Sequence, residues 1–189
     1  MDNIIVTLNE SISAVDLQLD FERVLTRIRK RNSQTNPRLE LVGAINDFCK
    51  DHAASSGHAC FFAQVLLDDL TDPRTDSELH ELLECLITVC ESSRDAVKFL
   101  LENTCSGEKV FKYMKSDDAL IKYDGLQLLK LLYGGDSISV VSAILKQPDV
   151  LGDIVEMTSG SSATFVRNES ISLLVQLSSD ACPELPSIL

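Results

Sequence analysis

The chain has 189 residues, and its 29 acidic side chains against 17 basic ones give a formal net charge of −12. An acidic surface of this strength repels phosphate backbones and anionic lipid, which excludes nucleic acid and broad membrane adsorption as expected partners. Aromatic residues make up 5% of the chain, Trp is absent, and there are only 8 Gly and 5 Pro. This composition indicates an all-α protein with a Leu, Ile and Val core, because many short strands would need more turn residues.

Residues 1–15 are an N-terminal segment before a single predicted domain over 16–189. The segment carries Asp2 and no basic residue ahead of its apolar stretch, so we expect no signal peptide. No apolar run reaches the roughly 20 residues that a membrane span needs. The six cysteines form no CxxC pair and lie mostly in apolar stretches, which predicts reduced thiols in a cytoplasmic protein.

A first helix is predicted over residues 17–28, where it would cap the domain; the basic run Arg27–Arg31 at its end is interpreted as solvated. Four longer helices follow, each with apolar residues at three- and four-residue spacing. The apolar positions are Leu39, Val42, Ile45 and Phe48; then Leu79, Leu82, Leu83, Leu86, Ile87 and Cys90; then Ile121, Leu128, Leu129 and Leu132; and lastly Val166, Leu173, Leu174 and Leu177.

Helix boundaries are marked by capping and breaking residues. Expected starts lie at Asn36-Pro37, Asp76 and Asp117, where a side chain can cap the helix or Pro can open it. Expected breaks lie at residues 55–57, 106–107, 134–135 and 159–162, which are rich in Ser and Gly. Shorter apolar helices are predicted after the long ones, for example over residues 61–70 and 151–157.

The long helices recur at nearly constant distances. The apolar pattern that begins at Ile121 reappears at Val166, 45 residues later, and matching patterns precede it by 42 residues and by 42 again. Such periods are typical of armadillo or HEAT repeats, in which a hairpin buries its apolar stripe only against its neighbours. The sequence therefore predicts a right-handed armadillo/HEAT-like α-solenoid of about four repeats, with units near 37–71, 76–115, 117–158 and 162–189.

Two clusters could carry metal chemistry. Cys49, His52, His58 and Cys60 offer zinc-type ligands within twelve residues, but only five residues separate the two pairs, which is short for a known site. The segment His80–Glu84 has Glu where a zinc-protease helix carries its second His. A Gly-rich phosphate loop, a Ser-centred elbow and a Ser/His/Asp set are also missing from the sequence. We therefore expect no enzyme, no cofactor and no metal.

The most distinctive local pattern suits a binding surface. Arg167 and Asn168 open the last long helix, and Lys122 and Tyr123 occupy the equivalent positions one unit earlier. Side chains that vary in this way from unit to unit are expected to contact a partner. The alternative is that they bond neighbouring backbone between the units.

Four segments, read in order, resemble the N-terminal armadillo head of the Uso-type vesicle-tethering factors. They are Asn36–Val42, Leu70–Leu79, Ile121–Leu129 and Val166–Leu174, the last with an Arg-Asn-acid string before a leucine-rich helix. The resemblance implies a cytoplasmic protein at Golgi or ER membranes that acts in ER-to-Golgi transport. It also implies Rab-type GTPases, SNAREs or golgins as partners, and a homodimer. The chain lacks the coiled coil and acidic tail of that family.

We thus expect a non-enzymatic protein–protein interaction module. Two other functions stay open at this point. The first is an armadillo-type scaffold outside membrane traffic, such as a chaperone exchange factor or kinase adaptor. The second is a small zinc-dependent enzyme that uses Cys49, His52, His58 and Cys60.

Overall fold

The computed structural model describes residues 19–26, 37–51, 56–71, 75–104, 107–160 and 162–180, and every regular element in these ranges is a helix. This described part of the chain is all-helical, as the composition predicts. Residues 19–26 are helical. The labelled helices are α2 (Pro37–Asp51), α3 (Ser56–Asp69), α4 (Asp76–Ser92), α5 (Arg94–Asn103), the 3-10 turn η1 (Glu108–Val110), α6 (Phe111–Met114), α7 (Ala119–Gly135), α8 (Ser137–Lys146), α9 (Pro148–Met157) and α10 (Thr164–Asp180).

The helix starts follow the capping residues, with one correction. α2 begins at Pro37 and α4 at Asp76, as predicted, and the Thr75 side chain caps α4 by accepting from Glu78 N at 3.1 Å. α7 was expected to start at Asp117, but its cap is the next residue. Asp118 Oδ1 accepts from the backbone N–H groups of Leu120 (2.7 Å) and Ile121 (3.3 Å). The capping carboxylate therefore sets the start of α7 at Ala119.

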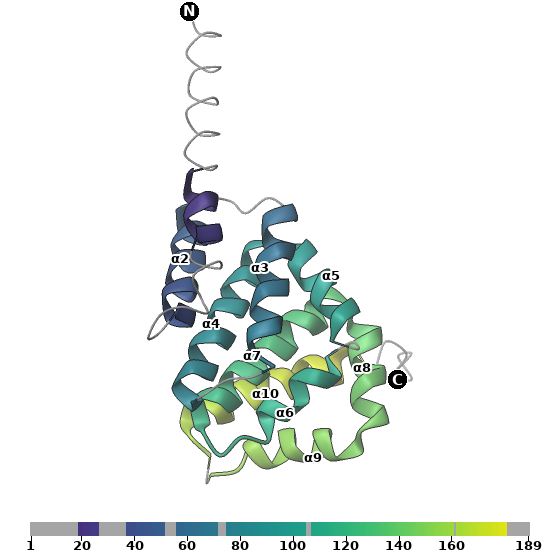
Figure 1. Ribbon diagram of the computed structural model, residues 1–189. Coiled ribbons are helices and arrows are strands. Elements are labelled where there is room, and N and C mark those ends of the chain that lie inside the picture. Colours follow the sequence, from purple (N-terminus) through teal and green to yellow (C-terminus); the bar gives the residue numbers. More distant parts are fainter. Residues whose placement is uncertain are drawn as a thin grey trace, which may run out of the picture.

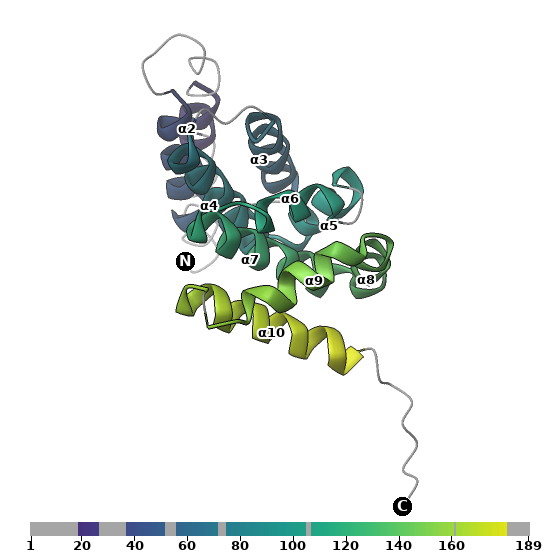
Figure 2. The same cartoon turned by 90° about the horizontal axis from the view of Figure 1, so that it is seen from below.

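The long helices lie side by side in chain order. α4 packs on α2 and on α7, and α7 packs on α10. Figure 2 shows α2, α4, α7 and α10 in this order from one end of the molecule to the other, with α3, α5 and α8 to one side of them and α9 along α10. In Figure 1, α2, α3 and α4 run down the page whereas α9 and α10 lie across it, so the stack twists between its ends.

The burial pattern relates the long helices to each other by simple shifts. All seven buried residues of α4 coincide with buried residues of α7 after a shift of 43 positions, for example Glu78 with Ile121 and Cys90 with Tyr133. Four buried residues of α2 fall on buried residues of α4 after 41 positions, and Ile121 and Leu128 of α7 fall on Val166 and Leu173 of α10 after 45. The predicted shifts were 42, 42 and 45. The two shifts that involve α4 are therefore each wrong by one residue, and the shift from α7 to α10 agrees.

The apolar stripe predicted for α4 also needs correction. Leu79 and Ile87 are only partly buried, whereas Cys85 and Val89 are completely buried. The reason is that α4 is covered by α2, α3, α5 and α7, so a wider arc than one stripe faces the core. None of the described helices is long and apolar enough to cross a membrane.

Candidate functional site

The shifts between the long helices define one row of equivalent, solvent-reachable side chains. We call Leu39 on α2, His80 on α4, Tyr123 on α7 and Asn168 on α10 the outer row. Leu39 and Asn168 are exposed, and His80 and Tyr123 are half-buried. Two of the four predicted binding residues, Tyr123 and Asn168, thus share equivalent positions on neighbouring helices.

Tyr123 links α7 to α10. Its ring meets the ring of Phe165 edge-on, with centroids 5.5 Å apart and planes at 84°. Gln127, one turn further along α7, donates a hydrogen bond from Nε2 to the Tyr123 hydroxyl at 2.8 Å. Phe165 lies one turn before Asn168 and is 41% exposed. Tyr123 therefore forms an aromatic pair with Phe165, beside the amide groups of Gln127 and Asn168. Aromatic residues are enriched in protein-binding surfaces.

Lys122 and Arg167, the other two predicted residues, belong to a different side of their helices. Consecutive residues of an α-helix are turned by about 100°, so neither side chain can share the direction of its neighbour in the outer row. Lys122 lines a cleft of about 500 Å³ with Met114, Met157 and Val166. Lys115 Nζ lies 3.7 Å from Asp153 Oδ2 at the same cleft. Arg167 is half-buried, and its backbone carbonyl accepts from Ser170 Oγ at 2.9 Å.

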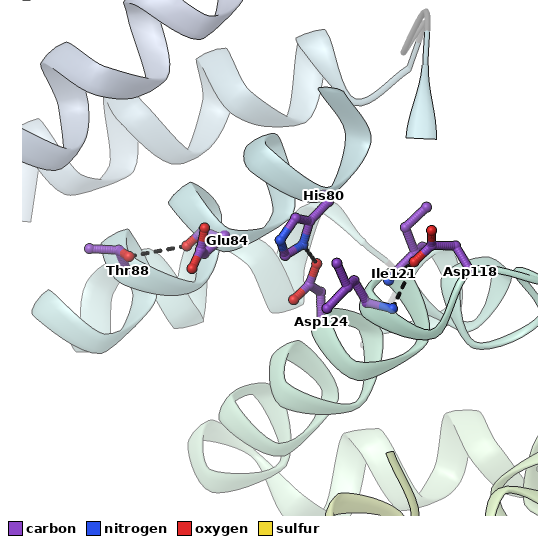
Figure 3. A network of polar contacts seen from close by, with 7 residues as sticks. His80, Glu84, Thr88, Asp118, Ile121 and Asp124 are labelled. Carbon is purple, nitrogen blue, oxygen red and sulfur yellow. Dashed lines mark hydrogen bonds and ion pairs between the residues drawn. The ribbon is translucent and has the colours of Figure 1, made fainter. Parts of the chain in front are cut away.

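His80, the α4 member of the outer row, is bonded across to α7. Its Nδ1 is hydrogen-bonded to Asp124 Oδ2 at 2.6 Å, and Figure 3 shows the imidazole and the carboxylate pointing at each other from the two helices. The Asp124 residue is 3% exposed, whereas the His80 side chain is 26% exposed. The imidazole is thus held by the buried Asp124 at one ring nitrogen, while the His80 side chain stays partly exposed to solvent.

The pair shifts the protonation of both groups. Burial raises the pKa of the Asp124 carboxyl to about 6, against the opposing pull of His80. Burial lowers the pKa of His80, but the hydrogen bond and charge of Asp124, with the charges of Glu84 and Glu81, outweigh it and leave that pKa raised. Both shifts favour a proton on the pair. Both groups therefore bind a proton more tightly in the folded chain than in the unfolded chain.

Sequence reasoning missed this contact. His80 was considered only as part of the imperfect zinc-protease motif, and the contact spans 44 residues, so no local pattern could reveal it. The available signal was Asp124 itself, which interrupts the apolar positions between Ile121 and Leu128. A carboxylate at a core-facing position needs a partner, and a facing helix is where that partner must lie.

A second polar contact joins α7 to α10. Lys130 Nζ forms an ion pair with Glu169 Oε1 and donates to Ser172 Oγ at 3.2 Å. The Tyr133 hydroxyl donates to the backbone carbonyl of Gln176 at 3.2 Å. Glu169 is the α10 equivalent of Asp124, after the shift of 45 residues. The same acidic position therefore faces a basic partner from the preceding long helix at both junctions.

The proposed zinc ligands do not form a described cluster. Cys49 is hydrogen-bonded to Ser92, and Cys60 Sγ donates to the Asp95 carbonyl at 3.5 Å. The His58 ring lies among phenylalanine rings, 4.4 Å from Phe21 and 5.4 Å from Phe48 between centroids. In the described part of the chain no three His, Cys, Asp or Glu side chains are placed to hold a metal. His52 and the basic run Arg27–Arg31 lie outside the described residues.

The site therefore offers a row of hydrogen-bonding and aromatic groups across four stacked helices. Asp124 orients His80 as a catalytic carboxylate would, yet among the described residues no hydroxyl or thiol bonds to the other ring nitrogen. The imidazole is therefore held at one ring nitrogen, by Asp124. Comparisons with protein-family models, with curated proteins and with solved structures found no match, so function is inferred from this geometry.

Proposed function

We propose that the chain is an α-solenoid of armadillo-like units that binds a partner protein along the outer row. The observation that carries the proposal is the coincidence of all seven buried residues of α4 with buried residues of α7 after a shift of 43 positions. Residues of one compact bundle face different neighbours and have no reason to share a pattern. Equivalent packing of successive helices is what a repeat array requires.

Polar residues support the same interpretation independently of the apolar ones. Glu40, Glu81, Asp124 and Glu169 occupy one equivalent position in the four long helices, after shifts of 41, 43 and 45 residues. Contacts between neighbouring long helices also recur at a similar separation: 44 residues for His80–Asp124, 42 for Lys130–Ser172 and 43 for Tyr133–Gln176. Asp124 and Glu169, with these bonds, join adjacent long helices at a similar register.

A protein is the partner that suits the outer row. The row runs across several helices, so it matches an elongated surface or segment better than a small molecule, which would need an enclosed pocket. Its chemistry is an aromatic pair, Tyr123 and Phe165, beside the amides of Gln127 and Asn168. The net charge of −12 disfavours nucleic acid. Rab-type GTPases, SNAREs and golgins are the first partners to test, because of the resemblance to vesicle-tethering heads.

Capture from a eukaryotic lysate tests the proposal. The immobilised chain is compared with the variant Tyr123→Ala/Asn168→Ala and with Gln64→Ala, which removes an exposed amide on α3 outside the outer row. We expect partners that the native chain and Gln64→Ala retain and the double variant loses. Capture that is equal for all three chains would contradict binding by the outer row.

The identity of the captured protein separates the candidate functions. Rab-type GTPases or SNAREs favour vesicle tethering at Golgi or ER membranes, whereas a heat-shock ATPase or a kinase favours a scaffold or exchange factor. Metal analysis of chelator-free protein tests the zinc-enzyme alternative, because such an enzyme would contain one equivalent of zinc per chain. The capture result and the metal result are independent of each other.

A further inference from the structure

The contact between α4 and α7 contains a charged group that the core does not otherwise neutralise. Asp124 projects from α7 at a position 3% exposed, and in the described part of the chain its carboxylate is hydrogen-bonded to His80 alone. A buried carboxylate is costly unless a partner compensates it. The stability of this joint therefore depends on the charge state of one imidazole.

The surroundings of the pair add negative charge. Glu81 and Glu84 act on it from α4, and Asp118 acts on it from the cap of α7. Figure 3 shows Glu84 one turn from His80, and Asp118 at the start of the helix that carries Asp124. No base among the described residues of the other packed helices acts on the pair. A proton on His80 is thus the positive charge available to this group of acids.

We propose that the α4–α7 contact is a proton-dependent latch, which is tight while the His80–Asp124 pair holds its proton and weakens when the pair loses it. With the proton, an imidazolium donates a charge-assisted hydrogen bond to the carboxylate. Without it, a neutral imidazole can still donate one bond, but the carboxylate stays buried under the repulsion of Glu84 and Asp118. Opening the joint then lets water reach Asp124 and relieves the repulsion.

The sign of the pH dependence follows from the two raised pKa values. An unfolded His titrates near pH 6.5, so His80 contributes its full stability below that pH and loses it as pH rises through its raised folded pKa. The pKa of Asp124 is raised from 3.8 to about 6, which makes the folded state lose stability as pH rises from about 4 to 6. Both groups bind protons more tightly in the folded state, so stability falls as pH rises.

Thermal unfolding between pH 5 and pH 9 tests the latch. The variants are Asp124→Asn, which removes the buried charge, and His80→Gln, which keeps a side-chain N–H donor without the proton. Relative to Asp124→Asn, the native chain should lose roughly 2–4 °C of Tm from pH 5.5 to pH 8.5, the size expected for the loss of one such contact in a domain of this length. Equal pH slopes for the two chains would overturn the proposal.

Two controls isolate the pair. His58→Gln removes an imidazole that lies among phenylalanine rings, and Glu156→Gln removes one exposed acid on α9. Glu156→Gln should keep the native slope, and His58→Gln should keep the pH dependence that Asp124→Asn abolishes. If Asp124→Asn fails to fold, NMR titration of the native chain decides. The chain has 3 His, so the His80 signal is assigned with His80→Gln, and a midpoint at or below pH 6.5 would also refute the latch.

Discussion

The end of α7 contains two adjacent glycines in very different surroundings, and exchanging each for alanine tests the packing of α7 on α5. A Cβ built on Gly135 would lie 2.6 Å from Val97 Cγ1 and 3.2 Å from Leu101 Cδ1, whereas a Cβ on Gly134 meets nothing within 4 Å. Val97 is buried on α5, and its β-branched side chain has little rotamer freedom. Gly135 is therefore required by the close approach of the two helices.

The expected magnitudes have opposite signs. Replacing Gly by Ala within a helix stabilises it by roughly 0.5–1 kcal/mol, so Gly134→Ala should raise the free energy of unfolding by up to that amount. Gly135→Ala gains the same term but forces Val97 and the backbone apart, and overpacking of this kind costs about 1–3 kcal/mol. The two variants should therefore differ by about 1–3 kcal/mol, with Gly134→Ala the more stable.

Urea unfolding followed by far-UV circular dichroism measures both variants. A double variant, Gly135→Ala/Val97→Ala, supplies the rescue, because shortening Val97 opens the space that the new methyl group needs. Its loss of stability should be smaller than the sum of the single losses, by about 1 kcal/mol or more. If Gly135→Ala proves as stable as Gly134→Ala, the α5–α7 approach described here is wrong.

Two further variants test the helix start and the α7–α10 contact. Asp118→Ala should lower the free energy of unfolding by about 1 kcal/mol through loss of the α7 cap, while Asp117→Ala, which removes the neighbouring acid, should leave it nearly unchanged; equal effects in urea unfolding would contradict the capping assignment. Lys130→Met should cost about 1–2 kcal/mol because it leaves Glu169 unpaired with 14% side-chain exposure. Lys130→Met/Glu169→Leu should recover most of that loss, and a double variant as unstable as the single one would refute the ion-pair role.

Periodicity predicted the helices well because each long helix buries a face against its neighbours. It failed in detail at α4, where Leu79 and Ile87 of the expected stripe are only partly buried, whereas Cys85 and Val89, which lie outside that stripe, are completely buried. A pattern of apolar residues at three- and four-residue spacing assumes that only one side of the helix is covered by other helices. α4 is covered on several sides, so the residues between the stripe positions are buried too, and the shift to α7 cannot be fixed to one residue from hydrophobicity alone.

The candidate site was predictable only in part, for a related reason. The shift of 45 residues that pairs Tyr123 with Asn168 also relates buried residues of α7 and α10, namely Ile121 with Val166 and Leu128 with Leu173. His80 was absent from the predicted row because that row was drawn only between α7 and α10 and was not extended to α4. Its bond to Asp124 depends on how two helices face each other, which a single sequence does not specify.

The serial order of the long helices has a mechanical consequence. α2 and α10 lie at opposite ends of the twisted stack (Figure 2), so a load applied between them is carried through each intervening joint in turn. The compliance of such a series is dominated by its softest member. If the α4–α7 joint loosens as His80 loses its proton, it becomes softer relative to the α2–α4 and α7–α10 joints, and the stiffness of the whole stack then varies with the acidity of its medium.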